Sequence, residues 1–191
     1  MAVAFVLLLA SVPLTGGRLG RLSGVQVRLT WLIVLALAVQ IVMTTVLAQA
    51  PHALLIGLHG LSYALIAWAI WANRALPGLL LIAAGGGTNA VVIALNGGTL
   101  PASASALDEA GFAVDPQEFK NSGVVRDPVL GWLGDIAATP AWLPFRNVIS
   151  IGDVVVLLGA ALMLHVTCRT SVYLVLTARR RAGAQPDPAP A

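Results

Sequence analysis

Several polar side chains that can bind a ligand or transfer a proton lie in or at the ends of long apolar stretches of this chain. His59 and Asp153 form an ionisable pair suited to a cation, a proton or a lipid headgroup, because charge inside an apolar medium is costly and tends to be functional. The other candidates contribute amide or phenol groups that donate and accept hydrogen bonds. The candidate ligand-binding residues are Gln40, His59, Tyr63, Asn89, Asn96 and Asp153.

The composition indicates which medium surrounds these side chains. The chain has 191 residues, of which 58% are hydrophobic and 10% are charged, whereas a soluble domain carries roughly 25% charged residues. The mean hydropathy is +0.88. We therefore expect an all-α integral membrane protein, since a helix satisfies its own backbone hydrogen bonds in lipid.

Catalytic and metal-binding signatures are absent from the sequence. It contains no Gly-x-Ser-x-Gly, His-Glu-x-x-His or Gly-Lys-Ser/Thr motif. The single cysteine, Cys168, excludes an intramolecular disulfide and cannot by itself form a zinc or iron-sulfur site. It shares a helix face with His165, and we interpret that pair as packing. The sequence therefore predicts no cofactor and no metal.

Long apolar runs, three of them free of charge, predict five membrane spans across about 30 Å of hydrocarbon. The first crosses only if its helix continues past Pro13 to Leu19. A signal peptide is the alternative, but no basic region precedes this segment. The predicted spans are residues 2–19, 29–49, 52–72, 76–95 and 148–168.

The arginines predict the orientation of the bundle, because short cytoplasmic loops retain basic residues during insertion. With five spans, the arginine-containing segments all fall on one side, which we assign to the cytoplasm of a bacterial plasma membrane. The N-terminus and the acidic segment 96–147 are then outside. The arginines are Arg18, Arg21 and Arg28 after the first span, Arg74 after the third, and Arg169, Arg179, Arg180 and Arg181 after the fifth.

The outer segment, residues 96–147, is too rich in large apolar groups for a disordered tether. Trp132 and Trp142 suit the interfacial zone of a membrane. We expect a structured outer loop with short helices, for example at Pro116–Asn121 and Val129–Ile136. Residues 1–181 are predicted to form one domain, and the Pro- and Ala-rich tail 182–191 is predicted to be disordered.

The candidate polar residues of four spans lie at similar depths below the outer surface. At 1.5 Å per residue, Gln40 is about 13 Å deep, His59 and Asn89 about 10 Å, and Asp153 about 9 Å. One interpretation is interhelical hydrogen bonding; the other is a pocket open to the outside that binds a ligand. For Asp153 alone, Ser150-Ile151-Gly152-Asp153 also has the form of a helix capping box.

Glycines within the spans have two interpretations as well. Gly85-Gly86-Gly87 lies in the middle of the fourth span, where it favours either a broken helix that coordinates a substrate or close approach of a neighbouring helix. Four other glycines are predicted to be packing positions. They are Gly57, Gly60, Gly152 and Gly159.

Short motifs along the chain resemble a bacterial family of small multi-spanning membrane proteins catalogued as a domain of unknown function. They are Gly16-Gly17-Arg18-Leu19, the Asn73–Gly78 turn, Asn96-Gly97-Gly98-Thr99-Leu100-Pro101, Leu133-Gly134-Asp135 and Ser150-Ile151-Gly152-Asp153. The resemblance implies an integral membrane protein and assigns no activity.

The expected role is non-enzymatic: binding or passing a small ligand or lipid through an outward-facing polar pocket, or serving as a subunit of a membrane assembly. The alternative is a lipid-active enzyme of the outer face, with Asp135 or Asp153 as acid or base and His59 as its partner. The expected partners are the lipid bilayer and a membrane protein or a second copy, without nucleic acid. Anionic headgroups are expected at Arg179, Arg180 and Arg181.

Overall fold

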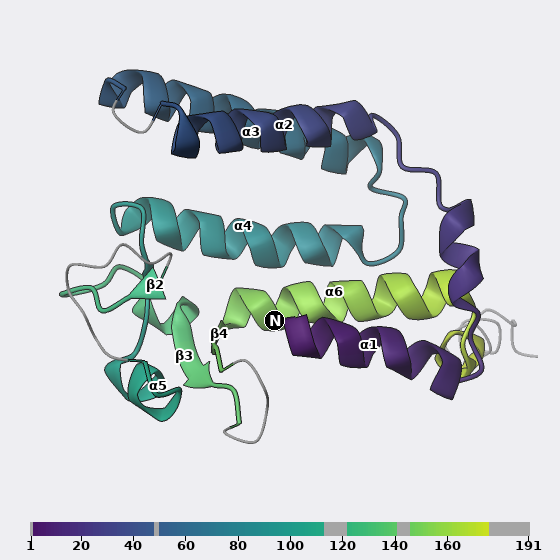
Figure 1. Cartoon of the computed structure of the whole chain (residues 1–191). Coiled ribbons are helices and arrows are strands. Elements are labelled where there is room, and N and C mark those ends of the chain that lie inside the picture. The colour runs from purple at the N-terminus through teal and green to yellow at the C-terminus, as the bar shows by residue number, and fades with distance from the viewer. Residues whose placement is uncertain (1, 48–49, 113–121, 141–145, 176–191) are drawn as a thin grey trace, which may run out of the picture.

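The structure is a computed structural model, and it describes residues 2–47, 50–112, 122–140 and 146–175. Within these residues, five long helices run along a common direction, and a small cap closes one end (Figure 1). The long helices are α1 (Ala2–Leu14), α2 (Thr30–Thr45), α3 (His52–Ala72), α4 (Leu79–Leu95) and α6 (Ile151–Cys168). The protein is therefore mostly helical.

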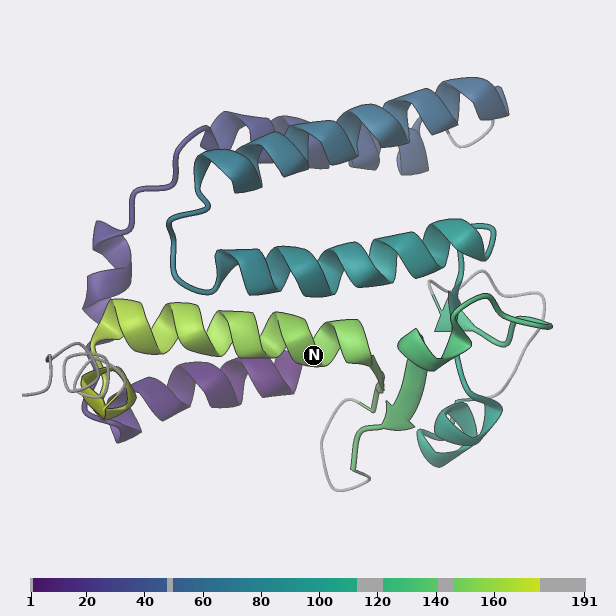
Figure 2. The same ribbon diagram turned by 180° about the vertical axis from the view of Figure 1, so that it is seen from behind.

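The long helices form two hairpins and an added N-terminal helix. α2 packs on α3, α4 packs on α6, and α1 packs on the far side of α6. Figures 1 and 2 show the α2–α3 hairpin as a separate layer beyond α4. Contact between α3 and α4 is slight, so the two hairpins are joined mainly through their connecting segments.

Asn73, at the end of α3, ties the base of the α2–α3 hairpin together. Its side chain accepts a hydrogen bond from the backbone N–H of Arg28 and donates to the carbonyls of Arg28 and Ala69, each at 2.7 Å. Asn73 is buried. The amide thus pairs with the backbone entering α2 as a neighbouring β-strand would. It also gives the Ala69 carbonyl a second hydrogen bond, beside the one from the Asn73 backbone N–H.

Glycines let α4 and α6 approach closely at two levels, Gly78 with Gly159 and Gly85 with Gly152. A Cβ built on Gly159 would lie 2.7 Å from the backbone nitrogen of Ile82 and 2.8 Å from the carbonyl oxygen of Gly78. A Cβ on Gly85 would meet the Gly152 carbonyl. These glycines are seven residues apart on each helix, so they form one face. The packing prediction is confirmed for Gly152 and Gly159.

The cap contains one short α-helix, as expected, but not at the predicted positions, and it also contains short strands. Its strands form a parallel pair, β1 with β2, and an antiparallel pair, β3 with β4. Small apolar residues, including Ala106, Leu107 and Val148, make its core. The cap elements are β1 (Leu100–Pro101), α5 (Ala104–Glu109), β2 (Ser122–Gly123), the 3-10 helix η2 (Gly131–Leu133), β3 (Asp135–Ala138) and β4 (Val148–Ser150).

These strands correct the all-α prediction for the outer segment. The helix predicted at 129–136 is wrong: only residues 131–133 are helical there, in a 3-10 turn, and β3 begins at Asp135. β3 is stabilised by pairing with β4, which follows after residues 139–147, so the pattern of residues 129–136 alone could not reveal the strand. The helix predicted at 116–121 and the tail 182–191 lie outside the described residues.

The predicted bounds of the spans also need correction. α1 ends at Leu14 instead of Leu19, because Gly16 takes a left-handed conformation, with φ +75°. The Gly17 N–H then bonds to the Val12 carbonyl at 2.9 Å, which completes a Schellman motif. A 3-10 helix, η1 (Leu19–Gly24), follows. The α3 prediction is correct at both ends, whereas α4 begins at Leu79 because Gly78 is left-handed.

By length and composition, α6 is the one helix in the described part of the chain that is sufficient to cross a membrane. Its 18 residues have a mean hydropathy of 2.0, and 22% of them are buried. A core helix of a soluble protein would be mostly buried, which α6 is not. The other long helices contribute shorter apolar segments within the residues searched, at Val3–Leu14, Thr30–Met43, Gly57–Ala72 and Leu79–Leu95.

Candidate functional site

Asn89 and Asp153 do meet, at the cap end of the α4–α6 pair. The Asn89 amide donates to Asp153 Oδ1 at 3.2 Å, and the Ser150 hydroxyl donates to Asn89 Oδ1 at 3.0 Å. Asn89 and Asp153 are half-buried, and Ser150 is buried. The three side chains thus form one interhelical hydrogen-bonded cluster.

Asp153 also completes the capping box predicted for α6. Its backbone N–H donates to Ser150 Oγ at 3.0 Å, and its Oδ2 accepts from the Ser150 N–H at 3.2 Å. Both carboxylate oxygens of Asp153 therefore already accept hydrogen bonds. A carboxylate at this position also favours the helix through the dipole of its N-terminus.

The capping role gives a direct prediction for Ser150. Its substitution by alanine is expected to lower the free energy of unfolding by about 1–2 kcal/mol, through loss of the cap and of the bond to Asn89. Thermal unfolding in detergent measures this. Ser103 is the matched control, because it is the N-cap residue of α5 but makes no side-chain capping bond. An equal loss in Ser103→Ala would contradict the assignment.

Gln40 joins a different partner, in the other hairpin. Its Nε2 lies 3.4 Å from the hydroxyl of Ser62, which is fully buried between α2 and α3. The Ser62 hydroxyl in turn donates to the His59 carbonyl at 2.9 Å. Gln40 therefore takes part in a contact within the α2–α3 hairpin.

His59 and Tyr63 lie on α3 and are both exposed. Their rings stack on each other, with centroids 5.9 Å apart. Within the described residues, His59 forms no ion pair with Asp153, which lies on α6 in the other hairpin. The acid-base pair expected of the alternative enzyme is thus not assembled here. Asp135 is buried in the cap, where its backbone pairs with Ser150.

Asn96 ends α4 and fixes the cap to it. Its Nδ2 donates to the carbonyls of Val92 and Val129 at 2.8 Å each, and its Oδ1 accepts from the Val129 N–H at 2.9 Å. Both hydrogens of this amide are therefore used by the backbone. The arrangement repeats, at the opposite end of the bundle, the way in which Asn73 holds Arg28.

The glycine run of α4 does not break the helix. Residues 79–95 are continuously helical, which corrects the interpretation of a discontinuous span. Gly85 faces α6, whereas a Cβ on Gly86 or Gly87 would have nothing within 4 Å. The same open space surrounds Gly57 and Gly60 on α3, so the packing prediction for these two glycines is wrong within a single chain.

Sequence reasoning missed a second polar cluster, at the interface of α1 with α6. Ser11 Oγ lies 3.2 Å from His165 Nε2, and His165 Nδ1 lies 3.0 Å from Thr170 Oγ1. Thr170 is fully buried. The only signal in the sequence was that Ser11 and His165 both lie in the predicted inner half of otherwise apolar segments. Cys168 packs nearby with Val12 and Leu164, as the packing interpretation expects.

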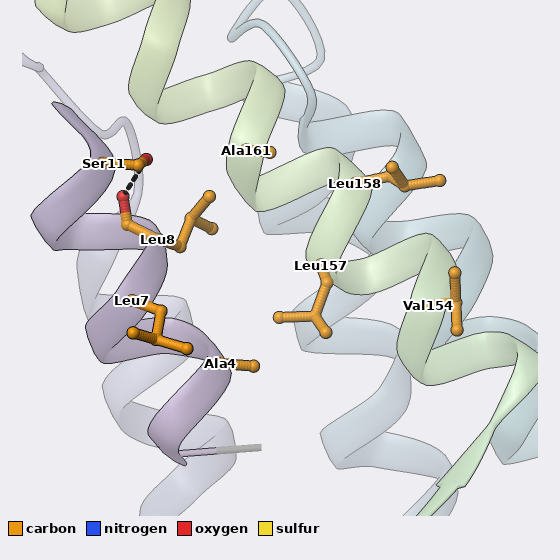
Figure 3. A pocket seen from close by; sticks show the side chains of 8 residues that line it. All are labelled: Ala4, Leu7, Leu8, Ser11, Val154, Leu157, Leu158 and Ala161. Atoms are coloured by element: carbon orange, nitrogen blue, oxygen red, sulfur yellow. Dashed lines mark hydrogen bonds between the residues drawn. The ribbon is translucent and has the colours of Figure 1, made fainter. Parts of the chain in front are cut away.

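A groove lies beside this cluster, between α1 and α6. Figure 3 shows Leu8 from α1 and Leu157 from α6 projecting into the space between the two helices. The groove has a volume of about 380 Å³. Ser11 provides its single hydroxyl. The lining residues are Ala4, Leu7, Leu8, Ser11, Val154, Leu157, Leu158 and Ala161.

Within the described residues, no group of three or more His, Cys, Asp or Glu side chains could hold a metal ion. Arg179, Arg180 and Arg181, expected at headgroups, lie outside those residues. Residues 24–165 match the model of a protein family described as a family of unknown function, DUF5317. The match includes α2 to α5 and most of α6 but not α1. No curated protein and no solved structure matches the chain.

Proposed function

We propose that this chain, which belongs to the DUF5317 family of unknown function, is an integral membrane protein that binds a hydrophobic ligand from the lipid phase. The proposal comprises five spans, α1 to α4 and α6, with the N-terminus and the cap outside. The ligand occupies the groove between α1 and α6. The observation that carries this role is the groove itself, whose lining is apolar apart from one hydroxyl.

The distribution of charge supports the membrane setting. Arg18 and Arg21 lie at the C-terminal end of α6, where the Arg21 guanidinium donates to the Cys168 carbonyl at 3.0 Å. Arg28 and Arg74 flank the hairpin base at the same end. The cap, with its acidic residues, occupies the opposite end (Figure 1). Between these ends, the long helices carry no Asp, Glu, Lys or Arg except Asp153.

Exposed tryptophans mark both ends of the bundle. Trp31 and Trp71 lie at the arginine end and are 61% and 65% exposed, and Trp132 in the cap is 62% exposed. Arg74 stands 4.5 Å above the Trp71 ring. Large exposed aromatic rings near charged groups suit the two interfacial zones of a bilayer.

Helix length varies among the proposed spans. The 21 residues of α3 reach about 31 Å, whereas α2 and α4 with 16 and 17 residues reach about 24 and 26 Å, less than about 30 Å of hydrocarbon, so they need a thinner bilayer. α1, with 13 residues, reaches about 20 Å. We propose that α1 is seated against α6 and locally thins the bilayer, as a short hydrophobic segment does.

Two variants, each with one cysteine added to the natural Cys168, test the topology. Cys168 is buried, so the natural chain should react slowly with a membrane-impermeant maleimide. In right-side-out spheroplasts, Ser105→Cys in the cap should be labelled at once, and Ser23→Cys at the arginine end only after permeabilisation. Labelling of both, or of neither, before permeabilisation would refute the topology.

Photolabelling tests the ligand role. The purified protein in vesicles is irradiated with a phospholipid that carries a diazirine in its acyl chain, and the labelled peptides are mapped. Label is expected on α1 and α6, and Ala161→Phe should reduce it several-fold by filling the groove. Ala67→Phe, on the exposed surface of α3, is the control. Uniform labelling that Ala161→Phe leaves unchanged would refute the groove as a binding site.

A role as subunit of an assembly is favoured by a separate observation. The open space beside Gly57 and Gly60 on α3, and beside Gly86 and Gly87 on α4, leaves room for another helix. A stable complex in mild detergent that is lost in Gly60→Leu would support this second candidate, whereas a monomer would argue against it.

A further inference from the structure

The hydrogen bonds of Ser11 restrict what the groove can bind. Its hydroxyl donates to the Leu8 carbonyl at 2.7 Å, one helical turn earlier on α1 (Figure 3). Since a hydroxyl has a single hydrogen, Ser11 must then be the acceptor in its contact with His165 Nε2. This assigns the proton of the imidazole to Nε2.

The contact of the other ring nitrogen, Nδ1, agrees with this assignment. A neutral imidazole with its proton on Nε2 accepts at Nδ1, and the Thr170 hydroxyl, 3.0 Å away, supplies the hydrogen. The alternative acceptor for Thr170, the His165 carbonyl, is farther away, at 3.4 Å. The chain of donors therefore runs from Thr170 through His165 to Ser11.

This series of hydrogen bonds leaves one lone pair of the Ser11 hydroxyl oxygen unused. The hydroxyl oxygen has two lone pairs, and His165 takes one of them. Ser11 is half-buried and lines the groove, so a ligand there meets an acceptor whose hydrogen is already engaged. A ligand that donates a hydrogen bond is matched to this oxygen, and one that only accepts is not.

The lining of the groove does not suit a charged headgroup on Ser11. Ser11 lies nine residues from the start of α1, or about 13 Å from its outer end, within the apolar part of this helix. No charged side chain lines the groove. A phosphate or carboxylate at this depth would be buried without a counter-charge, whereas a hydroxyl needs only one hydrogen bond.

From these two constraints we infer that the groove binds a neutral long-chain alcohol, with its hydroxyl on Ser11 and its chain extending toward the cap end. The inference rests on the proposed role of the groove and adds the chemical class of the ligand. The lining from Ala4 to Leu8 and from Val154 to Leu158 supplies the apolar walls for the chain. α1 lies outside the matched family segment, so the selectivity belongs to this chain's own N-terminal helix.

Three matched photoprobes test the inference in vesicles: a twelve-carbon alcohol with a diazirine near its centre, its methyl ether and the corresponding carboxylic acid. We expect the alcohol to label α1 and α6 about two- to tenfold more than the ether, which is the range for one hydrogen bond. The acid should label them least. Equal labelling by alcohol and ether, or preferred labelling by the acid, would overturn the inference.

Variants of Ser11 separate this result from the groove proposal. Ser11→Ala should lose the preference for alcohol while labelling by the ether stays unchanged, and Ser11→Thr should retain the preference. Ser23→Ala is the matched control, because Ser23 makes the same kind of bond, to the Gly20 carbonyl at 2.8 Å, away from the groove. An alcohol preference that persists in Ser11→Ala refutes the inference. If Ala161→Phe loses all labelling but the three probes label the natural chain equally, the groove binds a ligand without selecting for alcohols. That result would support the groove proposal and refute the inference about the alcohol.

Discussion

Replacing Gly159 with leucine is expected to lower the free energy of unfolding by about 3 kcal/mol. The side chain would begin with a Cβ 2.7 Å from the Ile82 nitrogen and 2.8 Å from the Gly78 oxygen. Both are backbone atoms, which cannot rotate away as the end of a side chain does. α4 and α6 would have to separate, and Asn89 would move away from Asp153 and Ser150.

Gly87→Leu is the control for this experiment. Gly87 lies on α4 too, but a Cβ there has nothing within 4 Å, and leucine has the higher helix propensity by nearly 1 kcal/mol. Thermal unfolding in detergent should therefore show a lower midpoint for Gly159→Leu and no decrease for Gly87→Leu. Unchanged unfolding of Gly159→Leu would refute close packing of the two helices. A lower unfolding midpoint for Gly87→Leu would show that another molecule packs against the face of α4 that carries Gly87.

The glycines also show how far the sequence can predict helix packing. Gly152 and Gly159 are predicted packing positions that the structure places at the α4–α6 contact, and Gly85, for which packing was one of two interpretations, lies there too. Gly57 and Gly60 have the same residue type and similar spacing, yet they face open space. A small residue indicates that a neighbour can approach, but the neighbour is set by how the hairpins pack, and that is not encoded in the spacing.

The helices were predictable because their signals are local. Long apolar runs give α2, α3, α4 and α6, and Pro51 marks the start of α3. The cap was not predictable in this way, since β1 pairs with β2 and β3 with β4 across intervening segments. The capping box of Ser150 and Asp153, which spans four residues, was correctly anticipated.

The candidate site depended on longer-range geometry, so the sequence predicted it only in part. Depth along each helix placed Asn89 level with Asp153, and these two side chains do bond. The depth of a residue in its helix does not show in which direction its side chain points around the helix axis, or which helix packs against it. Gln40 turns to Ser62 and His59 is exposed. The hydrogen bonds seen are those expected of interhelical contacts, and ligand binding by the six residues stays a prediction.

Asn73→Ala is expected to lower the free energy of unfolding by about 3 kcal/mol, at about 1 kcal/mol for each of its three hydrogen bonds. All three are 2.7 Å long, and the side chain is only 5% exposed. Its removal leaves the N–H and carbonyl of Arg28 without this partner. Because these bonds close the base of the α2–α3 hairpin, amide hydrogen exchange in residues 28–32 should also become faster.

Asn96→Ala provides the comparison that tests the effect of burial. Asn96 makes the same set of three bonds, to Val92 and Val129, but in a more exposed position. Water can replace the lost hydrogen bonds at an exposed site, so Asn96→Ala should lower the free energy of unfolding by only about 1 kcal/mol. Asn73→Asp should not restore stability, because the carboxylate keeps the acceptor for the Arg28 N–H but lacks both donors. Equal losses for Asn73→Ala and Asn96→Ala, or full stability of Asn73→Asp, would show that the hairpin base is not held by this amide.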